Sequence, residues 1–168
     1  LTKAVKESVI KINYNLDDTL VSLIRKAKEK ETNLTAVSIL DDIIQNQDIA
    51  KQGQIPLCQD TGVVVVFVEI GSEVVVTGDI YEAINEGVRQ GYKEGYLRKS
   101  IVNHPFKREN TLDNTPAIIH TKIVSGDQIK LKIASKGGGS ENMSKVTMLT
   151  PAAGIKGVKK LVLDTIFN

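Results

Sequence analysis

Hydrophobic residues recur at every third or fourth position over residues 1–52, with lysines and aspartates between them. This spacing gives a helix one apolar face, so the first part of the chain is predicted to form two or three amphipathic helices. Asn33 precedes the last of these, and its side-chain oxygen can accept a backbone N–H that the first helical turn leaves unpaired. Gly53 then ends the helical pattern.

Beyond Gly53, short runs of β-branched residues predict strands. The run at residues 63–70 is almost wholly apolar, which is typical of a buried strand. Further strands are predicted at 74–77, 117–124, 128–134 and 146–149, with helices at 79–96 and from Thr150-Pro151 onwards. The turn at 125–127 favours a β-hairpin between its two neighbours. The predicted class is α+β: N-terminal helices followed by a mostly antiparallel sheet with further helices.

Gly87, Gly91 and Gly95 recur at every fourth residue inside the predicted helix 79–96 and would therefore share one face. Each glycine costs about 1 kcal/mol of helix propensity relative to alanine. Consequently either the helix is frayed or its glycine face packs closely against another backbone, and we expect close packing.

The composition excludes several classes of protein. With 41% hydrophobic and 25% charged residues the chain resembles a globular domain. The 22 Lys and Arg against 20 Asp and Glu leave a net charge of +2, which lacks the excess of positive charge typical of a nucleic-acid binder. The longest apolar run, 63–68, is far shorter than the roughly 20 residues that cross a bilayer. We expect one soluble domain over residues 1–168, located in the cytoplasm, with no nucleic-acid or membrane partner.

Candidate chemistry begins with Cys58, Gln59 and Asp60, which place a thiol, an amide and a carboxylate on a loop bounded by Pro56 and Gly62. A lone cysteine is more often a small buried hydrophobe, and an Asp before Thr-Gly commonly closes a turn. The single cysteine is compatible with a reducing compartment, and any metal would need ligands from outside this chain.

The glycines at 137–139 have the spacing neither of a Walker phosphate loop nor of a dinucleotide-binding loop, because they are adjacent and precede a predicted strand. They offer unhindered backbone N–H groups to an anion, or they form a bulge that only turns the strand. Arg98 and Arg108 flank a long loop, and either could hold an acidic substrate or lie on the surface. His104 and His120 have no metal-ligand spacing and are interpreted as structural.

Four segments, taken in order, carry a resemblance. They are IPLCQDTG at residues 55–62, LRKS at 97–100, RENTLDNTPA at 108–117 and KGGGSEN at 136–142. Together they resemble the class I iron–sulfur fumarate hydratase family, specifically the α subunit of its two-subunit form, over essentially the whole chain. Tartrate dehydratase, a second member, shares the cysteine and triple-glycine segments, but Ser140-Glu141-Asn142 looks more like the fumarate branch.

The resemblance implies reversible hydration of fumarate to malate at a [4Fe–4S] cluster with one open iron. By similarity Cys58 is one of three cysteine ligands of that cluster, and Gln59 and Asp60 touch the substrate, with Asp60 a candidate for catalytic proton transfer. Arg98 matches the arginine that clamps a substrate carboxylate, and Gly139 matches a backbone donor. The loop from Asn110 to Pro116 is assigned to shaping the site.

The chain also departs from the family pattern, because family members carry their second and third cluster cysteines beyond the final helix. The chain starts at Leu1, so we expect the N-terminal part of a longer α subunit, inactive alone and completed by a β subunit in an oligomer of αβ units. The alternatives are a tartrate dehydratase α subunit, a non-catalytic scaffold domain of the same ancestry and, less favoured, an anion or nucleotide sensor.

Overall fold

The computed structural model describes residues 1–139, 142 and 144–167. They fall into two compact units, Leu1–Gly138 and a second unit that begins at Gly139, and each is described by itself. The expectation that residues 1–168 form one domain stays a prediction.

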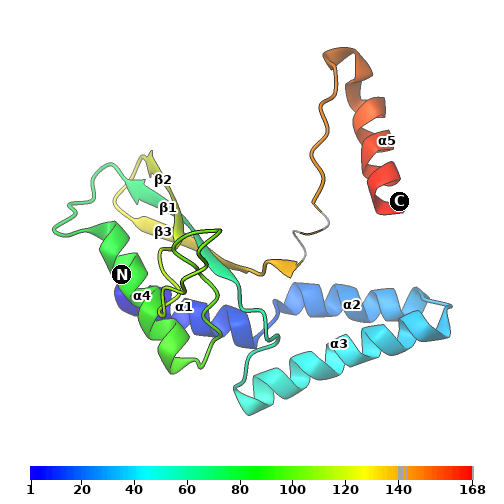
Figure 1. The fold of residues 1–168 in the computed structure, drawn as a ribbon, viewed down its shortest axis with the longest axis horizontal. Helices are drawn as coiled ribbons and strands as arrows, with labels where there is room; N and C mark the ends of the chain where they lie inside the picture. Colours follow the sequence, from blue (N-terminus) through cyan, green and yellow to red (C-terminus); the bar gives the residue numbers. More distant parts are fainter. Residues whose placement is uncertain (140–141, 143, 168) are drawn as a thin grey trace. The chain divides into compact units, whose positions relative to one another are not determined.

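Three helices begin the first unit, as the hydrophobic spacing predicts (Figure 1). They are α1 (Thr2–Tyr14), α2 (Asp18–Lys30) and α3 (Leu34–Gly53). Asp17 caps α2 by accepting a 2.9 Å hydrogen bond from the amide of Thr19. The predicted cap at Asn33 is confirmed, because its side chain accepts from the amides of Thr35 and Ala36 at 2.9 and 3.2 Å. Each cap satisfies N–H groups that a first helical turn leaves unpaired.

The sheet has three strands in the order β2-β1-β3. They are β1 (Val63–Gly71), β2 (Ile118–Val124) and β3 (Ile129–Lys136), and α4 (Ile80–Glu94) lies between β1 and β2 in the chain. β1 pairs with β2 in parallel and with β3 antiparallel, so Val65 faces Ile118 on one side and Ala134 on the other. The α+β class is confirmed, and the sheet is mixed.

The predicted hairpin between the two strands that flank 125–127 is wrong, because β2 and β3 each pair with β1, which lies between them. The most apolar strand thus takes the central position, where both of its edges are paired. The strand predicted at 74–77 is also wrong. The chain turns directly after β1, where the amide of Val74 donates to the carbonyl of Gly71 at 3.0 Å.

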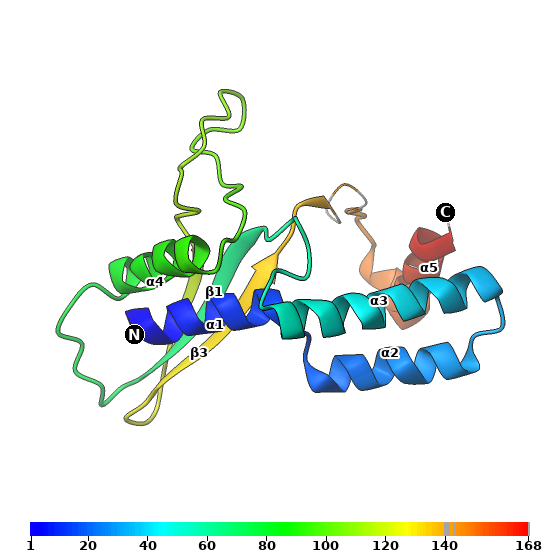
Figure 2. The ribbon, with the colours of Figure 1, turned by 90° about the horizontal axis from the view of Figure 1, so that it is seen from below.

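α1 and α4 lie side by side against one face of the sheet (Figures 1 and 2). Val64, Val66 and Val68 project from β1 into this core. They meet buried residues that both helices supply, which are Val5, Val9, Ile84, Val88 and Tyr92.

The predicted close packing of the glycine face is confirmed. A Cβ atom at Gly87 would lie 2.6 Å from Cβ of Val5, and one at Gly91 would lie 3.1 Å from Cγ1 of Val9. The absence of side chains at these positions therefore lets α4 approach α1 at van der Waals distance.

The second unit contains a short 3₁₀ helix, η2 (Pro151–Ala153), followed by α5 (Gly154–Phe167). Thr150 is the N-cap residue of η2, so the predicted start of this helical region is confirmed. The strand predicted at 146–149 is wrong, since these residues belong to no helix or strand. Among the helices that the structure describes, none combines the length and the apolar character needed to span a membrane.

Candidate functional site

The loop between α3 and β1 carries the residues that the sequence singles out. Gly62 ends this loop with φ = 61°, in the left-handed region that favours glycine. A Cβ atom at Gly62 would overlap the carbonyl group of Lys136 at the end of β3. A glycine is therefore required here, because the loop passes directly over the strand end that leads into the glycine segment.

Cys58, Gln59 and Arg98 line one cavity of about 330 Å³. Its other lining residues are Ile55, Pro56, Thr61 and Tyr96. The cavity thus joins the loop before β1 to the turn after α4, two segments almost forty positions apart in the sequence. Cys58, Gln59 and Arg98 are all exposed, so the thiol, the amide and the guanidinium are accessible to a small molecule.

The thiol of Cys58 has one described polar contact. The backbone amide of Asp60 donates a hydrogen bond to its sulfur at 3.4 Å. Amide donation to a cysteine sulfur is one way in which proteins tune iron–sulfur clusters, so the local geometry fits a cluster ligand. Within the described part of the chain, no group of three or more His, Cys, Asp or Glu side chains could hold a metal ion. Cys58 would therefore supply one ligand of a larger set.

Asp60 is half-buried and contacts the glycine segment. Its Oδ2 accepts a 3.0 Å hydrogen bond from the amide of Gly138, and a Cβ atom at Gly137 would lie only 2.8 Å from the same oxygen. The glycines therefore let the backbone approach a carboxylate, which is the capacity for anion binding that unhindered N–H groups confer. Gly139 begins the second unit, and Ser140 and Glu141 lie outside the described residues.

Buried side chains fix the backbone beneath the cavity. The hydroxyl of Tyr92 donates to the carbonyls of Thr61 and Gly62 at 2.8 and 3.1 Å. Burial raises the pKa of Tyr92 to about 12, so the hydroxyl stays protonated and remains a donor at neutral pH. Nδ2 of Asn114 donates to the same carbonyl of Gly62 at 2.9 Å. The end of the site loop is thus tied to α4 and to the long loop that precedes β2.

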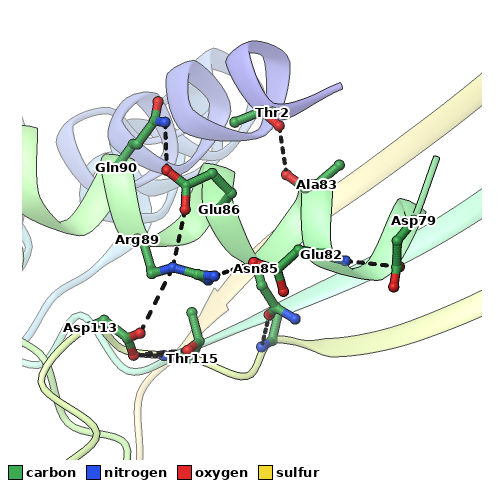
Figure 3. A network of polar contacts seen from close by, with 11 residues as sticks. Thr2, Asp79, Glu82, Ala83, Asn85, Glu86, Arg89, Gln90, Asp113 and Thr115 are labelled. Atoms are coloured by element: carbon green, nitrogen blue, oxygen red, sulfur yellow. Dashed lines mark hydrogen bonds and ion pairs between the residues drawn. The ribbon is translucent and has the colours of Figure 1, made fainter.

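Arg89 on α4 holds that long loop in place (Figure 3). Its guanidinium pairs with Asp113 at 3.9 Å and with Glu86 at 3.1 Å, and it also pairs with Glu82. Burial alone would raise the pKa of Asp113, but hydrogen bonds from Thr115, together with Arg89, hold it below its ordinary value. Asp113 is therefore a charged partner for Arg89 at neutral pH.

Three other polar residues from the sequence analysis lie elsewhere. Arg108 has a left-handed backbone, its amide donates to the carbonyl of His104 at 2.8 Å, and it is not among the residues that line the cavity. Nδ1 of His104 accepts from the amides of the same turn. His120 is on β2, where its ring stacks on Phe67 with centroids 5.0 Å apart. These contacts agree with the structural interpretation of both histidines.

Four residues of the site were not predicted from the sequence: Thr61 and Tyr96 line the cavity, and Tyr92 and Asn114 are its buried supports. Thr61 stands within the quoted octapeptide, so its neighbours offered a signal. Tyr92 lies inside the predicted helix 79–96, and Asn114 lies inside the loop from Asn110 to Pro116 that the family resemblance assigns only in general terms to shaping the site. No local pattern indicates that either side chain reaches the carbonyl of Gly62.

The geometry can be set beside known proteins. The family model described as "Fumarate hydratase (Fumerase)" matches residues 2–168. A protein of Methanocaldococcus jannaschii, provisionally named L(+)-tartrate dehydratase subunit alpha, is 40% identical over 160 residues, which are 91% of this chain and 56% of that protein. The L(+)-tartrate dehydratase α subunits of Escherichia coli K12 and Shigella sonnei are each 27% identical over 170 residues, covering 99% of this chain and 56% of their own length.

This chain therefore spans about half the length of these relatives. The family match covers both compact units and includes every residue that lines the cavity. The resemblance carried by the four sequence segments is confirmed, and the chain belongs to the fumarate hydratase family.

Proposed function

We propose that this chain is part of the α subunit of a hydro-lyase that reversibly adds water to a four-carbon dicarboxylic acid. Hydration of fumarate to malate is the first candidate reaction, because the matching family carries that description. The observation that carries the proposal is the single cavity shared by Cys58, Gln59 and Arg98, with Asp60 next to Gln59 in the same loop.

Arg98 is the residue that we assign to substrate binding through a carboxylate. Its guanidinium is planar and can donate two parallel hydrogen bonds to a carboxylate, which fixes orientation as well as charge. Gln59 adds an amide that can both donate and accept at the cavity wall. The backbone N–H of Gly139 is a further donor in this proposal, on the strength of the family resemblance.

Asp60 is the candidate for proton transfer. A carboxylate within hydrogen-bond reach of the reacting carbon or hydroxyl can act as acid or base. The amide of Gly138 holds Oδ2 at 3.0 Å and thereby limits the rotation of this side chain. A restrained carboxylate loses less freedom when the substrate binds, which suits a catalytic role.

The proposal includes a [4Fe–4S] cluster with Cys58 as one of three cysteine ligands. When bound, such a cluster would supply an open, Lewis-acidic iron for a substrate carboxylate and hydroxyl. The exposed thiol and the Asp60 amide that donates to it support this assignment. The remaining ligands would come from outside the described residues.

L(+)-tartrate is the second candidate substrate, and a specific observation favours it. The relatives reported above carry the name of tartrate dehydratase, including the one that is 40% identical. Both acids present two carboxylates, so the cavity residues named here suit either. The same names designate α subunits, which supports a β subunit as partner, and we place the enzyme in the cytoplasm as an oligomer of αβ units.

The test is reconstitution of the full-length α subunit with its β partner, iron and sulfide under anaerobic conditions. We expect fumarate to be hydrated, and the rate with L(+)-tartrate measured beside it decides between the two substrates. A Cys58→Ser variant should hold less iron, and its activity should fall in parallel with the iron content. A cluster-loaded complex that leaves both acids unchanged would contradict the proposal and would favour the non-catalytic scaffold.

A further inference from the structure

Asn114 is fully buried, with 0% of its surface exposed, yet its side chain is polar. Its backbone has φ = 63°, in the left-handed region that asparagine tolerates better than most residues. Burying an amide is unfavourable unless its hydrogen bonds are replaced within the protein. The hydrogen bonds of this side chain therefore indicate its role.

The amide of Asn114 joins two separate backbone segments. Its Oδ1 accepts hydrogen bonds from the backbone amides of Ser100 and Ile101, at 2.7 and 3.2 Å. Its Nδ2 donates to the carbonyl of Gly62 at 2.9 Å. An amide is a side chain that offers an acceptor and a donor at neighbouring atoms, so both segments are satisfied by one residue.

The two segments are those that carry the proposed substrate contacts. Gly62 closes the loop with Gln59 and Asp60, while Ser100 and Ile101 directly follow the turn with Arg98. A second link between the same segments, from the Thr61 hydroxyl to the Arg98 carbonyl, measures 2.7 Å. Asn114 thus closes a small ring of hydrogen bonds beneath the cavity, away from solvent.

α4 sets the position of Asn114 itself. The preceding residue, Asp113, is held by Arg89, and Oδ1 of Asn85 accepts a 2.9 Å hydrogen bond from the amide of Ala117 (Figure 3). The loop is therefore anchored to one helix on both sides of Asn114. Since α4 packs on α1 and the sheet, this anchor belongs to the core of the first unit.

We propose that Asn114 is a positioning residue, which sets the distance between Arg98 and the Gln59–Asp60 loop so that both meet one dicarboxylate. It touches neither the substrate nor a cofactor, and it acts through the backbone at Gly62, Ser100 and Ile101. The inference rests on the proposed function for its substrate. It assigns to the long loop a defined task in substrate binding.

The decisive variant is Asn114→Asp in the complete α–β enzyme. Aspartate keeps the acceptor for Ser100 and Ile101 and tolerates the left-handed backbone, but it places an oxygen against the carbonyl of Gly62. We expect kcat/KM to fall about tenfold, the scale of one lost hydrogen bond and a new contact between two oxygens, while the carbonyl of Gly62 keeps its donor from Tyr92. In an Arg98→Lys background the same change should cost less than about threefold, because the substituted side chain no longer makes the contact that Asn114 aligns.

Asn13→Asp is the matched control. Asn13 is also buried, and its Nδ2 donates to the Val9 carbonyl and the Ser135 hydroxyl, both at 2.8 Å, but its side chain bonds to neither site segment. We expect it to lower the unfolding midpoint in urea while changing kcat/KM by the same small factor in the unmutated enzyme and in the Arg98→Lys background. Equal losses from Asn114→Asp in both backgrounds would overturn the proposal and leave Asn114 as a structural residue only.

Hydrogen exchange in the unmutated enzyme gives a readout that needs neither activity nor a stable variant. The amides of Ser100 and Ile101 should exchange far more slowly than that of Glu109, which is exposed in the same loop region and whose amide makes no hydrogen bond within the described residues. Fast exchange at both amides would overturn the link. Loss of all activity in the unmutated enzyme would instead contradict the proposed function, and exchange would still decide whether Asn114 ties the two segments.

Discussion

The hydroxyl of Thr61 donates a 2.7 Å hydrogen bond to the carbonyl oxygen of Arg98. This contact joins the loop before β1 to the turn after α4, across one wall of the cavity that both residues line. The side chain of Arg98 remains exposed while its backbone is held. The arrangement leaves the guanidinium accessible to an anion and fixes the point from which it extends.

Replacing Thr61 by valine tests the importance of that contact. Valine has nearly the same shape but no hydroxyl, so we expect the unfolding free energy to fall by about 1 kcal/mol. The KM of the complete enzyme should rise as well, because Arg98 loses a backbone restraint. Urea unfolding and steady-state kinetics measure the two effects. Thr61→Ser keeps the hydroxyl and should retain most of both properties, and equal KM values for the valine and serine variants would refute the restraint.

Replacing Arg98 by lysine keeps the charge but removes the planar pair of donors. We expect KM for the dicarboxylate to rise about tenfold, since an ammonium cannot reproduce a two-pronged carboxylate contact. Arg108→Lys is the matched control, because Arg108 lies outside the cavity lining and should leave KM unchanged. Unchanged kinetics for Arg98→Lys would make Arg98 a surface residue.

Replacing Asp60 by asparagine removes the carboxyl group that is proposed to transfer the proton, with little change in shape. The asparagine oxygen can still accept from the amide of Gly138, so the glycine segment should keep its place. We expect kcat to fall by about 10² or more, the typical contribution of a general acid or base. Iron content is determined in parallel. A variant with normal iron content and near-normal turnover would remove Asp60 from the mechanism.

Local features of the fold could be predicted from the sequence, and non-local ones could not. The cap at Asn33 and the glycine face of α4 depend on residues a few positions apart, and both predictions are confirmed. The pairing of β2 and β3 with β1 joins residues that are more than fifty positions apart in the sequence. It depends on which of the three strands is apolar enough to lie at the centre of the sheet. A short connection at 125–127 suggested a hairpin instead, since it carries no information on the strand between.

The same division holds for the candidate site. The octapeptide around Cys58 singled out three neighbouring residues, and the family resemblance selected Arg98 from the two candidate arginines that flank the long loop. Tyr92 gave no such signal, because an aromatic residue inside a predicted helix has an ordinary local explanation, and Asn114 was included only through the loop from Asn110 to Pro116 that the resemblance assigned to shaping the site. Their convergence on the carbonyl of Gly62 is a property of the folded backbone.

Adding a methyl group at Gly87 should weaken the contact between α1 and α4. The new Cβ would lie 2.6 Å from Cβ of Val5 and 2.7 Å from the carbonyl oxygen of Thr2, so the helices must separate. We expect Gly87→Ala to cost about 1 to 3 kcal/mol of unfolding free energy, despite the better helix propensity of alanine. Gly91→Ala is the comparison, because its nearest neighbour lies at 3.1 Å and should yield at a smaller cost. The opposite order in urea unfolding would contradict this packing.

The buried hydroxyl of Tyr92 should make stability depend on pH in the alkaline range. Burial raises its pKa from 10.0 to about 12, so the folded protein holds this proton more tightly than the unfolded chain does. The stabilisation is therefore complete below pH 10 and is lost as the pH rises towards 12. Burial raises the pKa of Tyr14 as well, with a further contribution from Tyr96, and this acts on stability in the same direction.

The variant Tyr92→Phe separates the contribution of Tyr92 from that of Tyr14, because phenylalanine has no proton to lose. It also leaves the carbonyl of Thr61 without its tyrosine donor. We expect this variant to be less stable than the unmutated protein at pH 8, by about 1 to 2 kcal/mol, and to lose less stability on passing from pH 9 to pH 11. Parallel curves of unfolding free energy against pH for the two proteins would show that Tyr92 does not titrate on unfolding.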